Sequence, residues 1–134
     1  MWTCSKCERV FKITNQSHYC NEATIDTIFA GKPDILVHTF DELLVKVIDW
    51  EPNNVGVAKH AIVFTNKKAW LIVKPMSKEL DVKFYCDEAI RHPRVKKVKD
   101  WGKMFAHHIR VNDPAQIDEE VLQLLRKGFE YGMK

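Results

Sequence analysis

The first twenty residues combine cysteines and a histidine at spacings that suit a metal ion. Two residues separate Cys4 from Cys7, and ten residues further on, one residue separates His18 from Cys20. Thiolates two residues apart can bind one metal within a tight turn. Four nitrogen and sulfur ligands in a tetrahedral arrangement describe a closed structural zinc site. The spacing therefore predicts that Cys4, Cys7, His18 and Cys20 hold a structural Zn²⁺ ion.

The segment between the two ligand pairs has the pattern of a short strand followed by a turn. Residues 8–17 contain alternating apolar side chains and end in Asn-Gln-Ser. A hairpin of this kind would return His18 and Cys20 to Cys4 and Cys7. Three thiolates, a neutral imidazole and Zn²⁺ would leave one net negative charge. Basic residues close in sequence would offset that charge: Lys6, Arg9 and Lys12.

Other roles are possible for cysteines in this pattern. A thioredoxin-like redox pair opens a helix after a strand, and no strand is predicted before Cys4. A disulfide framework is disfavoured in a reducing cytosol, and a catalytic zinc would need an open ligand position. The cysteines could also be small buried apolar residues. Cys86 lies far away in a predicted strand and is expected in the core.

A second candidate site is the basic stretch of residues 91–103, in which Asp100 is the acidic residue. Phosphates favour such clusters through counterion release, and Trp101 could stack on an exposed base. Together with the finger residues Lys6, Arg9 and Lys12, the stretch predicts a nucleic-acid surface. Alternatively, the lysines could protect a solvated edge strand from unwanted pairing. The candidate residues in the stretch are Arg91, Arg94, Lys96, Lys97, Lys99, Trp101 and Lys103.

A third candidate is the pair His107–His108, expected in a strand. Adjacent strand residues point to opposite faces, so one histidine is expected in the core and the other on the uncovered face. There it could serve as a general acid or base, or line a small-ligand pocket with Lys74, Tyr85 and Trp70, with His60 nearby. No set of nucleophile, base and orienting group is visible, so a non-enzymatic role is favoured. A protein-interaction module is a further alternative, which exposure of Trp50, Trp70 or Tyr131 would support.

Hydrophobic spacing predicts helices on both sides of a β-rich middle. Helices are expected over residues 25–30 and 33–50 and after Asp113–Pro114. The strands expected between them cover residues 55–64, 68–75, 80–86, 94–101 and 105–112. Two helices far apart in sequence can cover one face of an antiparallel sheet. The predicted fold class is α+β: a two-layer sandwich of an antiparallel sheet of four or five strands with flanking helices, preceded by a small zinc finger.

Length and composition fit one globular domain with a small appendage. The chain has 134 residues, of which 46% are hydrophobic and 29% charged, and its formal net charge is +3. The expected division is a zinc finger over residues 1–23 and a sandwich domain over residues 24–134. No apolar run approaches the roughly 20 residues of a membrane span, and no signal-peptide pattern opens the chain. A cytoplasmic protein without a membrane partner is expected. P-loop, G-x-G-x-x-G, G-x-S-x-G and H-E-x-x-H motifs are absent.

Several segments together resemble a bacterial family of small proteins described as a domain of unknown function. They are W-T-C-x-x-C, N-Q-S-H-x-C, the following F-x-G-K, H-H-I-R-V and the C-terminal D-E-E-V-L-Q-L-L-R-K-G-F-E-Y-G. The resemblance runs through nearly the whole chain and implies zinc ligation by Cys4, Cys7, His18 and Cys20. Its C-terminal domain resembles appendages of predicted nucleases. The expected function is that of a zinc-binding, non-enzymatic module whose leading partner is nucleic acid.

Overall fold

The structure is a computed structural model that describes residues 2–3, 10–11 and 25–134. A two-stranded sheet and a six-stranded sheet are formed. The strands are β1 (Trp2–Thr3), β2 (Val10–Phe11), β3 (Asn54–Val57), β4 (Ile62–Thr65), β5 (Ala69–Pro75), β6 (Leu80–Cys86), β7 (Lys97–Asp100) and β8 (Phe105–Val111). The helices are α1 (Ile25–Ile28), α2 (Asp34–Val47) and α3 (Glu119–Gly132), and a 3₁₀ turn, η1 (Pro114–Gln116), precedes α3.

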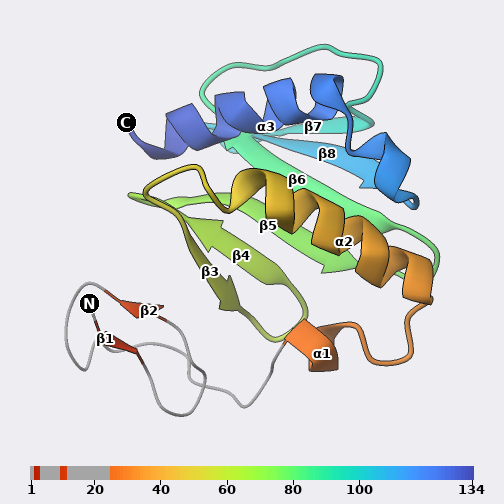
Figure 1. Cartoon of the computed structure of the whole chain (residues 1–134). Coiled ribbons are helices and arrows are strands. Elements are labelled where there is room, and N and C mark those ends of the chain that lie inside the picture. The colour runs from red at the N-terminus through yellow and green to blue at the C-terminus, as the bar shows by residue number, and fades with distance from the viewer. Residues whose placement is uncertain (1, 4–9, 12–24) are drawn as a thin grey trace.

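The six-stranded sheet is antiparallel throughout and has the order β3-β4-β5-β6-β8-β7 (Figure 1). Strands β3 to β6 follow one another as a meander. The chain then passes the position of β8, forms the edge strand β7, and returns through a β7–β8 hairpin. The sheet edges are therefore β3 and β7. Strand β2 lies beside β3, at the opposite edge from β7.

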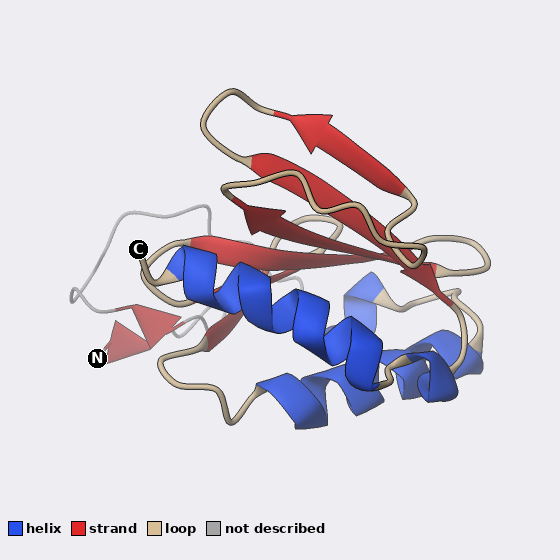
Figure 2. Cartoon of the chain, turned by 90° about the horizontal axis from the view of Figure 1, so that it is seen from above, coloured by secondary structure: helices blue, strands red, loops and turns tan. Residues whose placement is uncertain are grey.

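The long helices α2 and α3 lie on the same side of this sheet, and within residues 25–134 no long helix lies on the other side (Figure 2). Each helix buries one apolar stripe, as expected for a helix packed on a sheet. The stripe of α2 is Leu36, Phe40, Leu43 and Val47, and that of α3 is Val121, Leu124, Leu125 and Phe129. At Gly128 an added Cβ would lie 3.0 Å from the Cβ of Phe84, so glycine allows α3 to approach β6 closely.

Alternation along the strands separates a core side from a solvent side. In β6, Leu80, Val82 and Phe84 are fully buried against the helices, and the residues between them point the other way. We call the side of the six-stranded sheet opposite α2 and α3 the open face. The positions whose side chains reach it follow from the strand register.

A β-bulge lets two consecutive residues of β5 enter the core. Phe64 pairs with Leu71, but the next residue, Thr65, pairs with Ala69, so Trp70 is an extra residue. Trp70 and Leu71 are both fully buried. The Trp70 ring packs edge-on against Phe64, with the ring centroids 6.1 Å apart.

The predicted α+β class and the two-layer arrangement are confirmed, with six strands in the sheet rather than four or five. Residues 55–64, expected as one strand, form β3 and β4, because the N–H of Ala58 donates to the carbonyl of Ala61 over 2.8 Å and closes a turn. The last helix also begins later than Pro114. Asp118 accepts a hydrogen bond from the N–H of Val121 and caps α3.

The N-terminal predictions fall largely outside the described residues. The strand predicted within residues 8–17 corresponds to β2, which pairs antiparallel with β1. The metal ligands and basic residues expected around it lie outside the described part of the chain: Cys4, Cys7, His18, Cys20, Lys6, Arg9 and Lys12. Within residues 25–134, no helix is long and apolar enough to cross a membrane.

Candidate nucleic-acid interface

The open face carries a cluster of basic side chains on β5, β6, β8 and β7. Strand register places Lys83, His108 and Lys97 side by side across three neighbouring strands. Lys99 follows Lys97 on the same side of β7, because side chains alternate along a strand. We call the following residues the open-face cluster: Lys74, Lys83, Lys97, Lys99, His108 and Arg110.

Carboxylates offset only part of this positive charge. Asp81 and Glu79 both bind Arg110, whose Nε lies 2.8 Å from Asp81 Oδ1 and whose Nη1 lies 3.1 Å from Glu79 Oε1. Burial alone would lower the pKa of Arg110, but these two carboxylates outweigh it and raise that pKa. Among the described residues, no carboxylate forms an ion pair with the four lysines of the cluster, Lys74, Lys83, Lys97 and Lys99.

His108 is oriented by the carboxylate of Asp81 on the neighbouring strand. Its Nδ1 lies 3.0 Å from each oxygen of that carboxylate. Because an ionised carboxylate only accepts hydrogen bonds, Nδ1 carries the proton. Nε2 makes no hydrogen bond to any described residue. The imidazole thus stands between Lys83 and Lys97, and in the neutral ring its Nε2 is a hydrogen-bond acceptor. Nε2 donates to an anionic group only in a ring that carries a second proton.

Trp101 continues the open-face cluster at the tip of the β7–β8 hairpin. Its N–H donates to the carbonyl of Met104 over 2.9 Å, and Gly102 has a φ of 90°, which the turn requires and glycine allows. The Trp101 side chain is 54% exposed. Lys99 Nζ lies 5.1 Å from its ring centroid, within cation–π range. An exposed aromatic ring beside lysines is the combination that stacks unpaired bases in single-strand binding proteins.

Only part of the predicted basic stretch lies on the open face. Lys97, Lys99 and Trp101 share that face, and Lys96 is an exposed residue directly before β7. Arg91 and Lys103 are exposed, the first in the β6–β7 loop and the second in the β7–β8 turn. The structure thus brings together part of the stretch and joins it to basic residues of β5, β6 and β8.

Arg94 has a structural position rather than a place on this face. Its Nη1 donates to Asp118 Oδ2 over 2.8 Å and its Nη2 donates to the carbonyl of Gln116 over 2.9 Å. The hydrogen bond from Arg94 lowers the pKa of Asp118. Arg94 thereby ties the β6–β7 loop to the start of α3.

His107 faces the core, as alternation predicted for one member of the histidine pair. It is fully buried and stacks on Phe84, with the ring centroids 4.7 Å apart and the planes 9° from parallel. Its Nε2 accepts a hydrogen bond from the N–H of Ile90 over 2.9 Å, whereas Nδ1 has no partner among the described residues. Burial lowers the pKa of His107, and His108 acts in the same direction. His107 is a core residue that holds the β6–β7 loop on β8.

The free energy of unfolding is expected to fall as the pH is lowered from 7 to 5, partly because of His107. An unfolded histidine binds a proton near a pH of about 6.5, whereas folded His107 stays neutral to lower pH. The unfolded state then holds more protons, which costs up to about 1.4 kcal/mol per pH unit. Urea unfolding of wild type and His107→Gln across this range measures the effect. Glutamine keeps a hydrogen-bond acceptor for the N–H of Ile90 but does not titrate. The difference in the free energy of unfolding between wild type and His107→Gln should therefore become smaller as the pH is lowered. If the free energy of unfolding falls equally with pH in both proteins, His107 does not cause the pH dependence.

The aromatic residues named for a protein-interaction module are packed rather than free. Trp70 is fully buried on the helix side, so it shares no pocket with His108. Trp50 packs on Trp70 with centroids 6.0 Å apart, and the ring of Tyr131 lies 4.0 Å from Lys68 Nζ. Lys74 and Tyr85 do reach the open face, and His60 lies in the β3–β4 turn. Of the three tryptophans within residues 25–134, Trp101 is the exposed one.

Sequence reasoning missed several residues of the open face: Asp81, Lys83 as a neighbour of His108, and Arg110. A signal was present, because alternation places Asp81 and Lys83 on one side of residues 80–86 and Arg110 on the side of His108 in residues 105–111. Only the register between β6 and β8 brings them together. Among the described residues, no group of three His, Cys, Asp or Glu side chains could hold a metal ion, and the predicted ligands lie outside them.

The fold and the open face define an α+β domain with a basic sheet surface. A family model described as "Domain of unknown function (DUF5655)" matches residues 25–132, and the chain belongs to this family. No match was found among curated proteins or among solved structures. Family membership therefore brings no activity with it, and function has to be inferred from the residues themselves.

Proposed function

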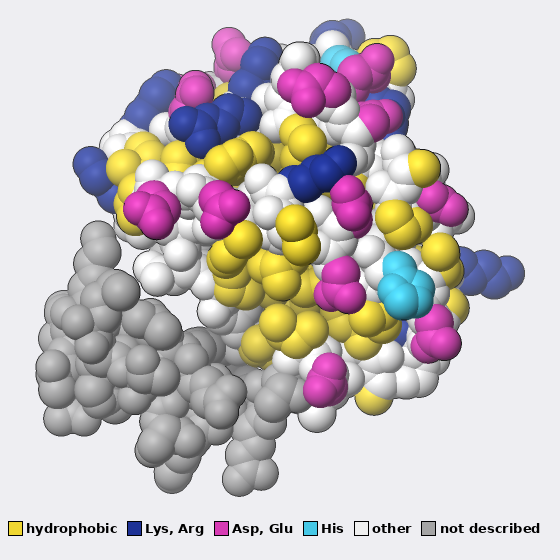
Figure 3. All heavy atoms as spheres, viewed as in Figure 1, with side chains coloured by type: hydrophobic (Ala, Val, Ile, Leu, Met, Phe, Trp, Pro, Cys, Tyr) yellow, Lys and Arg dark blue, Asp and Glu magenta, His cyan; other side chains and the backbone are white. Residues whose placement is uncertain are grey.

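We propose that this chain is a non-enzymatic, zinc-binding module that binds single-stranded nucleic acid on the open face of its sheet. One observation supports the proposal above all others. Lysines without carboxylate partners among the described residues share an uncovered sheet face with exposed Trp101. Figure 3 views the helix side, where acidic and basic side chains are interspersed. The open face offers a different surface, because Asp81 and Glu79 bind Arg110 and leave the lysines uncompensated.

Physical chemistry favours a single strand over a duplex on this face. Each lysine that neutralises a phosphate releases counterions, and this term supplies affinity without sequence preference. The ring of Trp101 can stack only on a base that is not already stacked within a helix. Phosphates along β6, β8 and β7 and a base on Trp101 would use both features of the surface together.

The proposal includes one structural Zn²⁺ ion held by Cys4, Cys7, His18 and Cys20. Three thiols and an imidazole are a donor set that suits zinc, and four protein ligands leave no open position for catalysis. The zinc would hold the N-terminal segment together. A reducing cytoplasm, the expected location, keeps such thiols available as ligands.

The open face is tested by reversing the charge of Lys97 and Lys99, two exposed lysines that form no ion pair with a described carboxylate. Fluorescence anisotropy with labelled single-stranded DNA and RNA, at about 50 and 200 mM salt, measures affinity and its salt dependence. Lys97→Glu/Lys99→Glu is expected to weaken binding by about 10- to 100-fold at low salt. It should also flatten the plot of log affinity against log salt by about 1.4, since two phosphate contacts are lost.

A matched control separates a local contact from a change in net charge. Lys67→Glu/Lys127→Glu changes the charge equally at exposed positions in the β4–β5 turn and on α3. It should bind nearly as wild type does. Equal losses in both variants, or no binding of any oligonucleotide at low salt, would sink the proposal. Intact oligonucleotides are expected after incubation. Cleavage that disappears in His108→Ala would instead favour the enzymatic alternative.

A further inference from the structure

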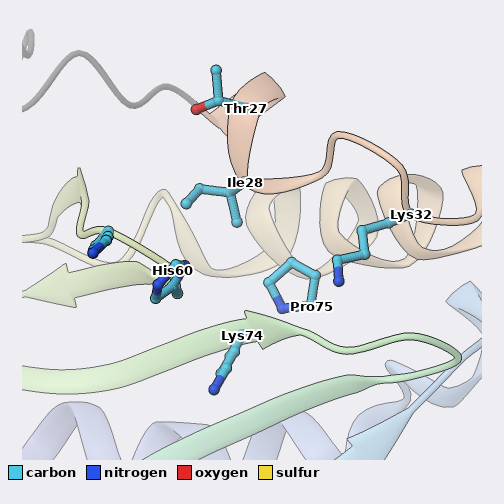
Figure 4. A pocket seen from close by; sticks show the side chains of 7 residues that line it. Thr27, Ile28, Lys32, His60, Lys74 and Pro75 are labelled. Carbon is cyan, nitrogen blue, oxygen red and sulfur yellow. The ribbon is translucent and has the colours of Figure 1, made fainter.

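A cavity of about 350 Å³ lies at one end of the sheet, where three segments distant in sequence meet (Figure 4). Ile28 and Lys32 come from α1 and the turn that follows it, and His60 comes from the β3–β4 turn. Pro75 ends β5, with His60 on one side and Lys32 on the other. Ile28 and Pro75 supply apolar walls. The cavity therefore combines a small apolar lining with basic side chains.

Every charged or titratable residue that lines this cavity is basic. Lys59 and Lys74 complete the lining beside Lys32 and His60, and of the described residues no Asp or Glu takes part. None of these lysines forms an ion pair with a described carboxylate. Positive charges that are brought together without carboxylate partners create a positive electrostatic potential in a concave site. A bound anion would offset this potential.

The size and charge of the cavity select one class of ligand. Its volume lies at the lower end of the range of about 300–1,000 Å³ for small-molecule sites, enough for a phosphate and an attached sugar. A phosphate within a nucleic-acid chain carries one negative charge, whereas a phosphate monoester carries about 1.5 to 2 at neutral pH. We infer that this cavity binds a phosphate monoester, either the terminal phosphate of a nucleic-acid strand or that of a free nucleotide.

Lys74 connects the cavity to the open face. It extends from β5 away from α1 (Figure 4), and strand register pairs it with Asp81 of β6, so both side chains lie on the open face. A strand that follows the open-face cluster toward β5 would reach the cavity with its end. Binding of a strand end in the cavity rests on the proposed function. Binding of a free nucleotide there does not.

The test compares one single-stranded oligonucleotide carrying a phosphate at its 5′ end, at its 3′ end or at neither. Wild type is expected to prefer one phosphorylated end by about tenfold, the size of one charge-assisted contact. Lys32→Glu/Lys59→Glu should abolish this preference, while Lys97→Glu/Lys99→Glu should weaken all three probes and keep it. Lys67→Glu/Lys127→Glu is the charge-matched control. Calorimetric titration with adenosine 5′-monophosphate forms the second arm, which needs no strand.

The two arms distinguish failure of the cavity from failure of the open face. In one outcome, the three oligonucleotides bind with equal affinity, wild type binds the nucleotide and Lys32→Glu/Lys59→Glu does not. This result would support the cavity with a free phosphate monoester as its ligand. If the ends are not distinguished and the nucleotide does not bind, the inference is overturned. Failure of the unphosphorylated strand to bind at low salt counts against the proposed function alone, because the nucleotide arm still tests the cavity.

Discussion

Trp70→Ala is expected to lower the free energy of unfolding by about 3–5 kcal/mol, a large part of the roughly 5–15 kcal/mol that stabilises a typical domain. Trp70 has no exposed surface and joins strands and helix in one aromatic cluster. Its ring meets Phe129 of α3 nearly at right angles, with centroids 5.3 Å apart, and Trp50 lies 6.0 Å away. Urea unfolding followed by circular dichroism measures the loss.

The same substitution at Trp101 makes a matched control with the opposite expectation. Trp101 is more than half exposed at the hairpin tip, so Trp101→Ala should change the free energy of unfolding by no more than about 0.5 kcal/mol. It should nevertheless weaken oligonucleotide binding, since stacking on a base contributes about 1–3 kcal/mol. If Trp70→Ala proves too unstable to purify, Trp70→Phe gives a smaller loss in the same direction. A strongly destabilised Trp101→Ala protein would show that its ring is part of the fold and not of an interface.

The helices and most strands could be predicted from the sequence because their signals are local. Buried residues of α2 recur three or four positions apart, and those of β6 recur every second position. The β3–β4 turn could not be predicted in this way. Lys59 and His60 occupy it without glycine, proline or asparagine, and only the hydrogen bond from Ala58 to Ala61 reveals it. Residues 55–64, in which Lys59 and His60 are the polar residues, therefore have the sequence pattern of a single strand.

The candidate site was predictable where it depended on alternation and unpredictable where it depended on pairing. Alternation implied that one of His107 and His108 faces the core. Which one does so depends on the partner of each side chain: Phe84 stacks on His107, and Asp81 binds His108 from 27 positions away. Arg94 looked like its basic neighbours, but a carboxylate 24 positions away binds it.

The cavity shows the same limit more sharply. Lys32, His60 and Lys74 belong to three elements, and no spacing in the sequence relates them. Their only common property before folding is positive or titratable charge, which in most proteins marks solvent-exposed positions. Three-dimensional closeness, and not composition, turns them into a candidate site.

Replacing Cys7 by serine is expected to remove zinc from the protein. Purified wild type under reducing conditions should contain close to one zinc ion per chain by elemental analysis. Structural zinc contributes about 10–16 kcal/mol in isolated finger peptides, and a serine hydroxyl is a poor substitute for a thiolate. Cys7→Ser should therefore lose the metal or hold it far more weakly against a competing chelator.

Cys86→Ala is the matched control for the loss of one thiol. Cys86 is a buried residue of β6 within the sheet, so its substitution should cost stability but retain zinc. Cys7→Ser should show the reverse, because the core of residues 25–132 consists of contacts between its own helices and strands. The two variants thus separate metal binding from domain stability. Wild-type protein without near-stoichiometric zinc would refute the metal site. Zinc retained in Cys7→Ser would show that Cys7 is not one of the ligands. Neither result would alter the open-face cluster, whose residues all lie on the six-stranded sheet.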